Sequence, residues 1–400
     1  MVDRNELDGR LLPEPNTRTF NTLIQSCALS GGDAADSKCR DIFEMIEEAE
    51  EMNFDVQPDR DTILSGLSSL ARPGPSGVSA FNADRARWWI DQMQELREES
   101  DDSSFIANTQ VYNAPLRWSG GAESSRTRPY TQGLPWDRHS EIFSEGFRTL
   151  QESDPLWIEA RRIEEWMLEM QTDGVEPDVE SFEAAVQAWS RTGTSDGLRK
   201  AEELLNRALV SDKVRLRFQS FHPVLAAWAY SGDESSLDKL DEWSERLERE
   251  CIAYPELKPD ERMDLAKLIA KRKAQKRLLS HGGDEAISMA SEIAESCKKD
   301  VDDLVDKAIS DSSVALDPTT FSHALSAWGD VALSKAASES VRHEATKEML
   351  GVVEKYDKAL QHWLSMLRER QFDSLSTLGK MDPQLQQLLQ YSHTVYLNVL

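Results

Sequence analysis

The sequence is poor in the residues that build disulfides, metal centres and membrane spans. Its 400 residues include four cysteines, Cys27, Cys39, Cys251 and Cys297, which form no CxxC or His–Cys pattern. We therefore expect neither a zinc site nor a disulfide framework, and a reduced compartment suits such a chain. No run of about 18 apolar residues occurs, so no membrane partner is predicted.

Motifs of catalysis are also missing. There is no P-loop, dinucleotide glycine fingerprint, HExxH or GxSxG, and the seven histidines are scattered singly. The acidic residues Asp300, Asp302, Asp303 and Asp306 fall on a polar helix face, where such residues are typically solvated rather than metal-bound. The sequence predicts a protein that is not an enzyme and carries no cofactor.

Basic residues are scarce. Lysine and arginine total 46 against 72 acidic residues, which gives a net charge of −26. An acidic surface repels polyanions and argues against nucleic acid, although a local groove can still be basic. The largest basic block is a predicted helix that carries Lys267, Lys271, Arg272, Lys273, Lys276 and Arg277. The block can grip phosphates, act as a nuclear-import signal, or form a solvated face balanced by acidic neighbours.

The two ends carry their own signals. Residues 1–8 are acidic and resemble neither an organellar transit peptide nor a secretory signal. Residues 394–400 look like the opening of another repeat, so we expect the sequence to be a fragment of a longer protein.

What the sequence does contain is a repeat. A bulky residue follows an aromatic residue by seven positions, as in Phe182 with Trp189, Phe221 with Trp228, and Phe321 with Trp328. An Asp stands four positions before both Phe182 and Phe321. Seven residues are about two helical turns, so both rings lie on one face. A single helix cannot bury that face, and the pattern predicts stacked helix-turn-helix units in which the three tryptophans are buried.

The repeat divides the chain into segments. The clearest unit has helices at 179–191 and 196–209, and the last clear unit has a long second helix at 338–369. Between two of the anchors lies a gap of 100 residues, which leaves room for one or two further units. The expected segments are a tail (1–14), repeats (15–118), a loop insertion (119–150), repeats (151–256), degenerate helices with the basic block (257–315), and C-terminal repeats (316–400).

These residues resemble the pentatricopeptide repeat family. The likeness is carried by residues 19–24, by Tyr112–Asn113, and by the unit endings at Pro58–Asp59 and Pro177–Asp178, and loop insertions lengthen the units. The tetratricopeptide signature is absent. The resemblance implies an all-α, right-handed superhelical solenoid that binds single-stranded RNA in RNA processing, stability or translation, in a mitochondrion or plastid, although no transit peptide is visible.

The resemblance also implies which residues read bases. In that family one side chain follows the aromatic anchor and the other ends the unit. Carried over, the pairs are Asn21 with Asp59, Leu64 with Asn108, Asn113 with Asp178, Glu183 with Arg217, and His222 with Asp260. The family rule makes the two Asn–Asp pairs uridine readers, since an amide can both donate to and accept from a base edge. Leu64 cannot do so and Glu183 matches poorly.

Two alternatives remain open at the sequence level. The asparagines and aspartates can instead only cap and solvate helices, because Asp59 and Asp178 stand where N-caps stand. At the level of the whole chain, the alternative to RNA binding is a scaffold of helical repeats for protein partners, which the acidic composition favours.

Overall fold

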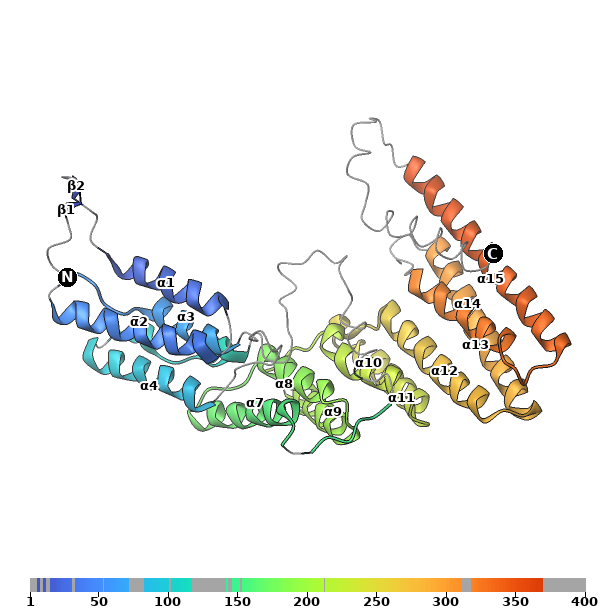
Figure 1. Ribbon diagram of the computed structural model, residues 1–400, viewed down its shortest axis with the longest axis horizontal. Coiled ribbons are helices and arrows are strands. Elements are labelled where there is room, and N and C mark those ends of the chain that lie inside the picture. The colour runs from blue at the N-terminus through green and yellow to red at the C-terminus, as the bar shows by residue number, and fades with distance from the viewer. Residues whose placement is uncertain are drawn as a thin grey trace. The chain divides into compact units, whose positions relative to one another are not determined.

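In a computed structural model, the residues that can be described are all-helical apart from one minimal hairpin (Figure 1). The structure describes residues 6–7, 10–11, 15–30, 33–52, 54–71, 83–100, 102–116, 142, 146–151, 153–211, 213–310 and 318–369. Within these residues lie fourteen α-helices, which pack in neighbouring pairs. The predicted all-α class is confirmed at this level.

The chain forms two compact units. The first comprises Met1–Thr127 and Thr149–Arg215. Its hairpin pairs β1 (Glu6–Leu7) antiparallel with β2 (Arg10–Leu11). Its α-helices are α1 (Thr17–Ser30), α2 (Asp33–Glu51), α3 (Arg60–Ala71), α4 (Ala83–Ser100), α5 (Thr109–Asn113), α7 (Pro155–Thr172), α8 (Val179–Arg191) and α9 (Ser195–Val210), with 3-10 turns η2 (Ser103–Phe105) and η3 (Ala114–Leu116). Helix α1 packs on both α2 and α3, as expected where one helix pair stacks on the next.

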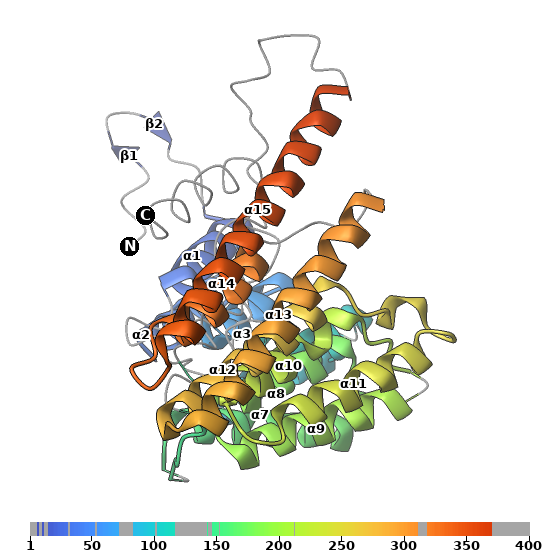
Figure 2. The ribbon, with the colours of Figure 1, turned by 90° about the vertical axis from the view of Figure 1, so that its right-hand side faces the viewer.

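The second compact unit comprises Arg128–Arg148 and Leu216–Leu400. Its helices are α10 (His222–Ser231), α11 (Ser236–Glu250), α12 (Glu261–His281), α13 (Asp284–Ser310), α14 (Pro318–Ala332) and α15 (Glu339–Glu369), with 3-10 turns η5 (Phe218–Phe221) and η6 (Pro255–Leu257). Helix α10 packs on α12 and α12 packs on α14, while α13 packs on α15. Figures 1 and 2 both show α12 to α15 side by side.

The region predicted to be degenerate is one regular pair. Helices α12 and α13 fill the gap between the two clear units, so the described residues hold one additional pair there. The repeat is hard to recognise in this stretch because Asp264 occupies the position of the aromatic anchor. Helix α12 is 21 residues long and α13 is 27, and both contribute buried aliphatic residues, such as Leu268 and Val301, to one hydrophobic cluster.

Two of the three anchor tryptophans are buried in the core, and the third is only partly buried. Trp189 is 2% exposed and Trp328 is 6% exposed, and Trp189 meets Trp157 edge to face with centroids 5.0 Å apart. Trp228 was expected to be buried and is only partly so, and its ring meets Phe147 edge to face with centroids 6.0 Å apart. The anchor rule therefore holds for Trp189 and Trp328 and is wrong in degree for Trp228.

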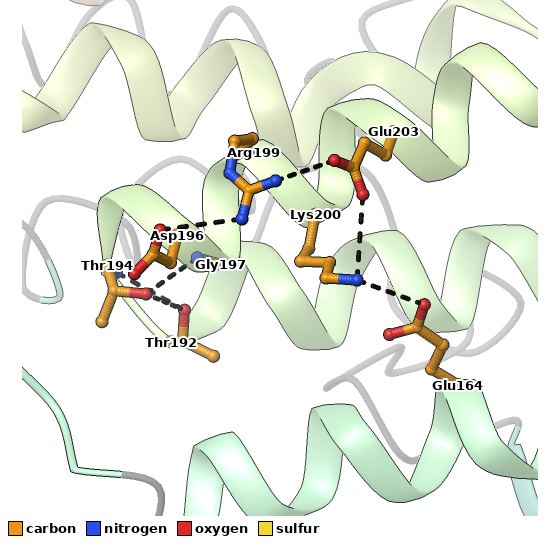
Figure 3. Close-up of polar contacts among 8 residues, drawn as sticks. All are labelled: Glu164, Thr192, Thr194, Asp196, Gly197, Arg199, Lys200 and Glu203. Carbon is orange, nitrogen blue, oxygen red and sulfur yellow. Dashed lines mark hydrogen bonds and ion pairs between the residues drawn. The ribbon is translucent and has the colours of Figure 1, made fainter.

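Local sequence signals set the helix ends, and α9 shows how. The Thr194 side chain caps the helix by accepting a hydrogen bond of 2.9 Å from the Gly197 amide (Figure 3). A Cβ at Gly197 would lie 2.0 Å from the hydroxyl of Thr192, so the turn requires glycine. Further along α9, Lys200 reaches Glu164 of α7 at 3.8 Å. The cap fixes where α9 begins, and the ion pair joins it to α7.

Close packing of large against small residues joins the helices within a pair. A Cβ added to Gly66 of α3 would lie 2.4 Å from the Trp89 ring of α4, so glycine makes room for this fully buried indole. The Trp89 ring meets Phe43 of α2 edge to face at 5.5 Å and donates to Asp36 at 3.2 Å. Trp89 of α4 therefore packs against both α2 and α3.

Two sequence predictions concern regions with little structural description. Most of the predicted loop insertion at 119–150 lies outside the described residues, as does the end of the chain after residue 369. No helix among the described residues is both long and apolar enough to cross a membrane.

Candidate nucleic-acid interface

The first Asn–Asp pair is assembled in the structure as a three-residue network. The Asn21 amide nitrogen donates to Asp59 Oδ1 at 2.9 Å, and the Thr62 hydroxyl donates to Asn21 Oδ1 at 2.6 Å. Asp59 and Thr62 also form a reciprocal cap at the start of α3, with bonds of 2.8 and 3.0 Å. The side chain at one first helix is thereby joined to the N-terminus of the next.

The second pair repeats the same construction. The Asn113 amide nitrogen donates to Asp178 Oδ1 at 2.8 Å, and the Ser181 hydroxyl donates to Asn113 Oδ1 at 2.6 Å. Asp178 and Ser181 form the capping box of α8. Because 65 residues separate Asn113 from Asp178, the network fastens α8 to α5 across a long stretch of chain.

The two networks differ in how far their asparagine side chains are exposed to solvent. Asn21 is half-buried, so its amide keeps one N–H and one oxygen lone pair beyond the bonds to Asp59 and Thr62. Asn113 is 1% exposed and Ser181 is fully buried. In this conformation Asn113 acts as a connection between helices, whereas Asn21 can also meet a partner from outside.

The other three pairs predicted from the family rule are not joined in this way. Asn108 caps α5 and accepts from Arg60 of α3 at 3.0 Å, while its partner Leu64 is aliphatic. Glu183 and Arg217 belong to different compact units.

His222 and Asp260 approach each other through Arg262. Asp260 caps α12 by accepting from the Arg262 amide at 2.9 Å, and the Arg262 guanidinium lies 2.7 Å from His222 Nδ1. Burial and the Arg262 charge lower the pKa of His222 to about 3, so this imidazole is neutral near pH 7. A neutral, 6% exposed imidazole is poorly placed to meet a base edge.

The basic block does not form one face. Its side chains leave α12 in several directions and pair with carboxylates of the surrounding helices. Lys267 meets Asp241 of α11 at 2.7 Å. Lys271 meets Asp300 of α13 at 2.5 Å, and Arg272 meets Asp330 of α14 at 3.3 Å. Of the alternatives left open by the sequence, these contacts favour a face balanced by acidic neighbours at Lys267 and Lys271, because the tertiary packing supplies each with an acid.

The remaining three basic residues lie further along α12. Burial first, and then the charges of Lys276 and Arg272, lower the pKa of Lys273. Arg277 lies near enough to Asp233 to help lower the pKa of that carboxyl. Lys276 is exposed and makes no ion pair within the described part of the chain. Positive charge that is not neutralised therefore concentrates around Lys276.

The acidic cluster of α13 is used in ion pairs. Asp300 holds Lys271, and Asp302 and Asp306 hold Lys355 of α15 at 3.7 and 3.3 Å. No group of three metal-ligating side chains was found in the described residues.

Sequence reasoning missed the partners that complete these networks. Thr62 and Ser181 had a local signal, since a hydroxyl three residues after an N-cap Asp is typical of a capping box. Arg262 had none, because its contact with His222 depends on which helices pack together.

Neither the scan against protein-family models nor the search of curated proteins found a match. The likeness to the pentatricopeptide repeat therefore rests on the residues of this chain alone.

Proposed function

We propose that this protein is a non-enzymatic helical-repeat protein that binds single-stranded RNA along its first helices. The observation that supports this proposal is the Asn–Asp pair built twice with the same geometry, at 2.9 and 2.8 Å. We also propose that the helix pairs follow the right-handed superhelix of pentatricopeptide-like repeats. The protein then acts in RNA processing, stability or translation.

The chemistry of Asn21 fits a base reader. Asp59 takes one amide hydrogen and Thr62 supplies a hydrogen to the amide oxygen, so the plane of the amide is fixed before any ligand arrives. The second N–H and the second lone pair then form an adjacent donor and acceptor. Uracil offers the complementary acceptor and donor on its pairing edge, which is why single-stranded uridine suits this group.

A selection experiment tests the proposal at Asn21. RNA molecules enriched from a random pool by the wild-type chain are compared with those enriched by Asn21→Ser and by Asp154→Ala. Asp154 caps the second helix α7 and contacts no predicted reader, so Asp154→Ala is a control that removes a side-chain hydrogen bond at a helix end away from the readers. We expect Asn21→Ser to change base preference at one position, with affinity lower by about 1–3 kcal/mol, and the control to keep the wild-type motif.

Two results would overturn the proposal. One is a wild-type chain that enriches no RNA, and the other is an Asn21→Ser variant that enriches the wild-type motif unchanged. In the second case the Asn21 network is a helix connection only.

A second candidate function is a scaffold for protein partners. It is favoured by the net charge of −26 and by the pairing of Lys267 and Lys271 with acids of their own unit. Such a surface suits a basic protein partner better than a polyanion. A chain that enriches no RNA but remains folded and monodisperse would favour the scaffold.

A further inference from the structure

Three basic side chains meet between α12 and α14. Arg272 and Lys276 lie one helical turn apart on α12, and so on the same face. The Arg272 guanidinium is 3.1 Å from Nδ1 of His323 on α14. Because guanidinium groups only donate, Nδ1 must accept, and the imidazole proton then sits on Nε2 as a further donor.

This cluster has more hydrogen-bond donors and positive charges than acceptors to match them. Asp330 is the carboxylate that pairs with Arg272, at 3.3 Å, and the Arg272 Nε is buried without a hydrogen-bond partner in the described residues. Lys276 is exposed and has no acid within ion-pair distance among those residues. Two full positive charges and an N–H donor therefore face one carboxylate.

The contrast with the rest of α12 singles out this position. Lys267 and Lys271 each have a close carboxylate at 2.7 and 2.5 Å, so they have little left for a ligand. Burial, together with the charges of Arg272 and Lys276, lowers the pKa of His323 to about 4, so these cations act on the imidazole without full compensation. An arriving anion would relieve this local repulsion.

We propose that Arg272, Lys276 and His323 form a site for one phosphate group. Arginine matches the geometry of phosphate oxygens, lysine adds a point charge, and His323 Nε2–H donates a hydrogen bond. Asp330 holds the guanidinium in place. In the RNA-bound protein this group is a backbone phosphodiester, and that assignment alone rests on the proposed function.

The histidine signal of the full chain tests the site directly. The protein is labelled with 13C at histidine Cε1, and the His323 signal among the seven histidines is identified as the one lost in His323→Gln. Inorganic phosphate is titrated against chloride at constant ionic strength. We expect a saturating shift of the His323 signal with phosphate and none with chloride.

Matched lysine variants test the composition of the site. Lys276→Gln should weaken the phosphate dependence about tenfold, the scale of one charged hydrogen bond, and Lys276→Arg should restore it. Lys299→Gln removes another exposed lysine, on α13, and should leave the titration unchanged. A His323 signal that phosphate does not move in the wild type would overturn the site, whatever RNA does elsewhere on the protein.

A separate titration with single-stranded RNA tests the source of the phosphate. RNA should move the His323 signal in the wild type and move it less in Lys276→Gln. RNA that binds the chain without moving His323 would overturn the phosphodiester assignment. If RNA does not bind at all but phosphate still shifts the His323 signal, the phosphate site is supported. Both the phosphodiester assignment and the proposed function are then refuted.

Discussion

At the scale of single residues, the packing of Gly66 against Trp89 sets a strict size limit. A methyl group at residue 66 would lie 2.4 Å from the indole, which is itself fully buried and held by Phe43 and Asp36. We expect Gly66→Ala to lower the free energy of unfolding by about 1–3 kcal/mol through overpacking. Urea denaturation followed by tryptophan fluorescence measures it.

Gly351 provides the control. It lies in α15, and an added Cβ would meet nothing within 4 Å. Gly351→Ala should therefore stabilise its helix by about 0.5–1 kcal/mol, since alanine favours helix interiors. Equal effects of the two substitutions would contradict the packing described for Gly66.

One buried histidine, His222, and one partly buried histidine, His323, give the protein a dependence on pH. The folded pKa of His222 is about 3 and that of His323 about 4, against an ordinary value of 6.5. Burial is the main cause for both, followed by Arg262 for His222 and by Arg272 and then Lys276 for His323. Between these values the unfolded chain binds protons that the folded chain does not. Their contribution to stability is therefore complete above pH 6.5 and falls as the pH drops towards 4.

The prediction for His222 follows from this difference. Between pH 7 and pH 5 its protonation in the unfolded chain should lower the free energy of unfolding by about 1–2 kcal/mol. His222→Gln should flatten the pH dependence by that amount, whereas His281→Gln, at an exposed position, should not. Denaturation midpoints measured at the two pH values test this prediction. The same change in midpoint for wild type and His222→Gln would refute it.

At the scale of elements, α12 organises its neighbours. Its cations reach α11, α13 and α14, and Gln275, fully buried, donates at 2.9 Å to backbone carbonyls of both Ala290 and Ala327. The chain has a net charge of −26. In that acidic chain, the positive charges of α12 connect the acidic helices around it through ion pairs. This explains why its sequence looks like a nucleic-acid patch although much of it faces protein.

Substitutions on α12 separate the two uses of its charges. Lys271 is 22% exposed and its partner Asp300 33%, so Lys271→Met should cost about 1–2 kcal/mol of stability by leaving Asp300 without its cation. Lys276→Met, at an exposed lysine without an ion pair among the described residues, should cost almost nothing. Thermal unfolding of both variants gives the comparison, and equal losses would show that Lys271 does not hold the unit together.

The sequence predicted the elements best where caps mark their ends. Asp178 and the following residues placed the start of α8 at 179, and the long last helix was expected at 338–369 and runs from Glu339 to Glu369. The pairing that the family resemblance implies names Asn21 and Asp59 together, and these two side chains share a hydrogen bond.

Other parts of the candidate site were beyond sequence reasoning. Periodicity places Lys271 and Arg272 on a helix, but their partners Asp300 and Asp330 lie on other helices, 29 and 58 residues away. Which acid meets which base depends on the packing of α12 against α13 and α14. The burial of Asn113 could not be predicted either, because this side chain is shielded from solvent only when the helices pack together.

At the scale of the whole molecule, charge decides between the two functions. A net charge of −26 opposes any polyanion at long range, so RNA binding requires local contacts strong enough to overcome it. Added salt screens the repulsion as well as the phosphate contacts. A net gain of binding at low salt would therefore show that the local contacts, such as those proposed for Lys276 and Arg272, dominate.

The most direct test of RNA binding is a filter-binding series with random single-stranded RNA at several salt concentrations. The account predicts retention of RNA at low salt that falls as salt rises, with a slope that becomes shallower by about one in Lys276→Gln. Lys299→Gln should keep the wild-type slope. Absence of retention at the lowest salt, by a chain whose circular dichroism shows it to be folded and helical, would contradict the central claim.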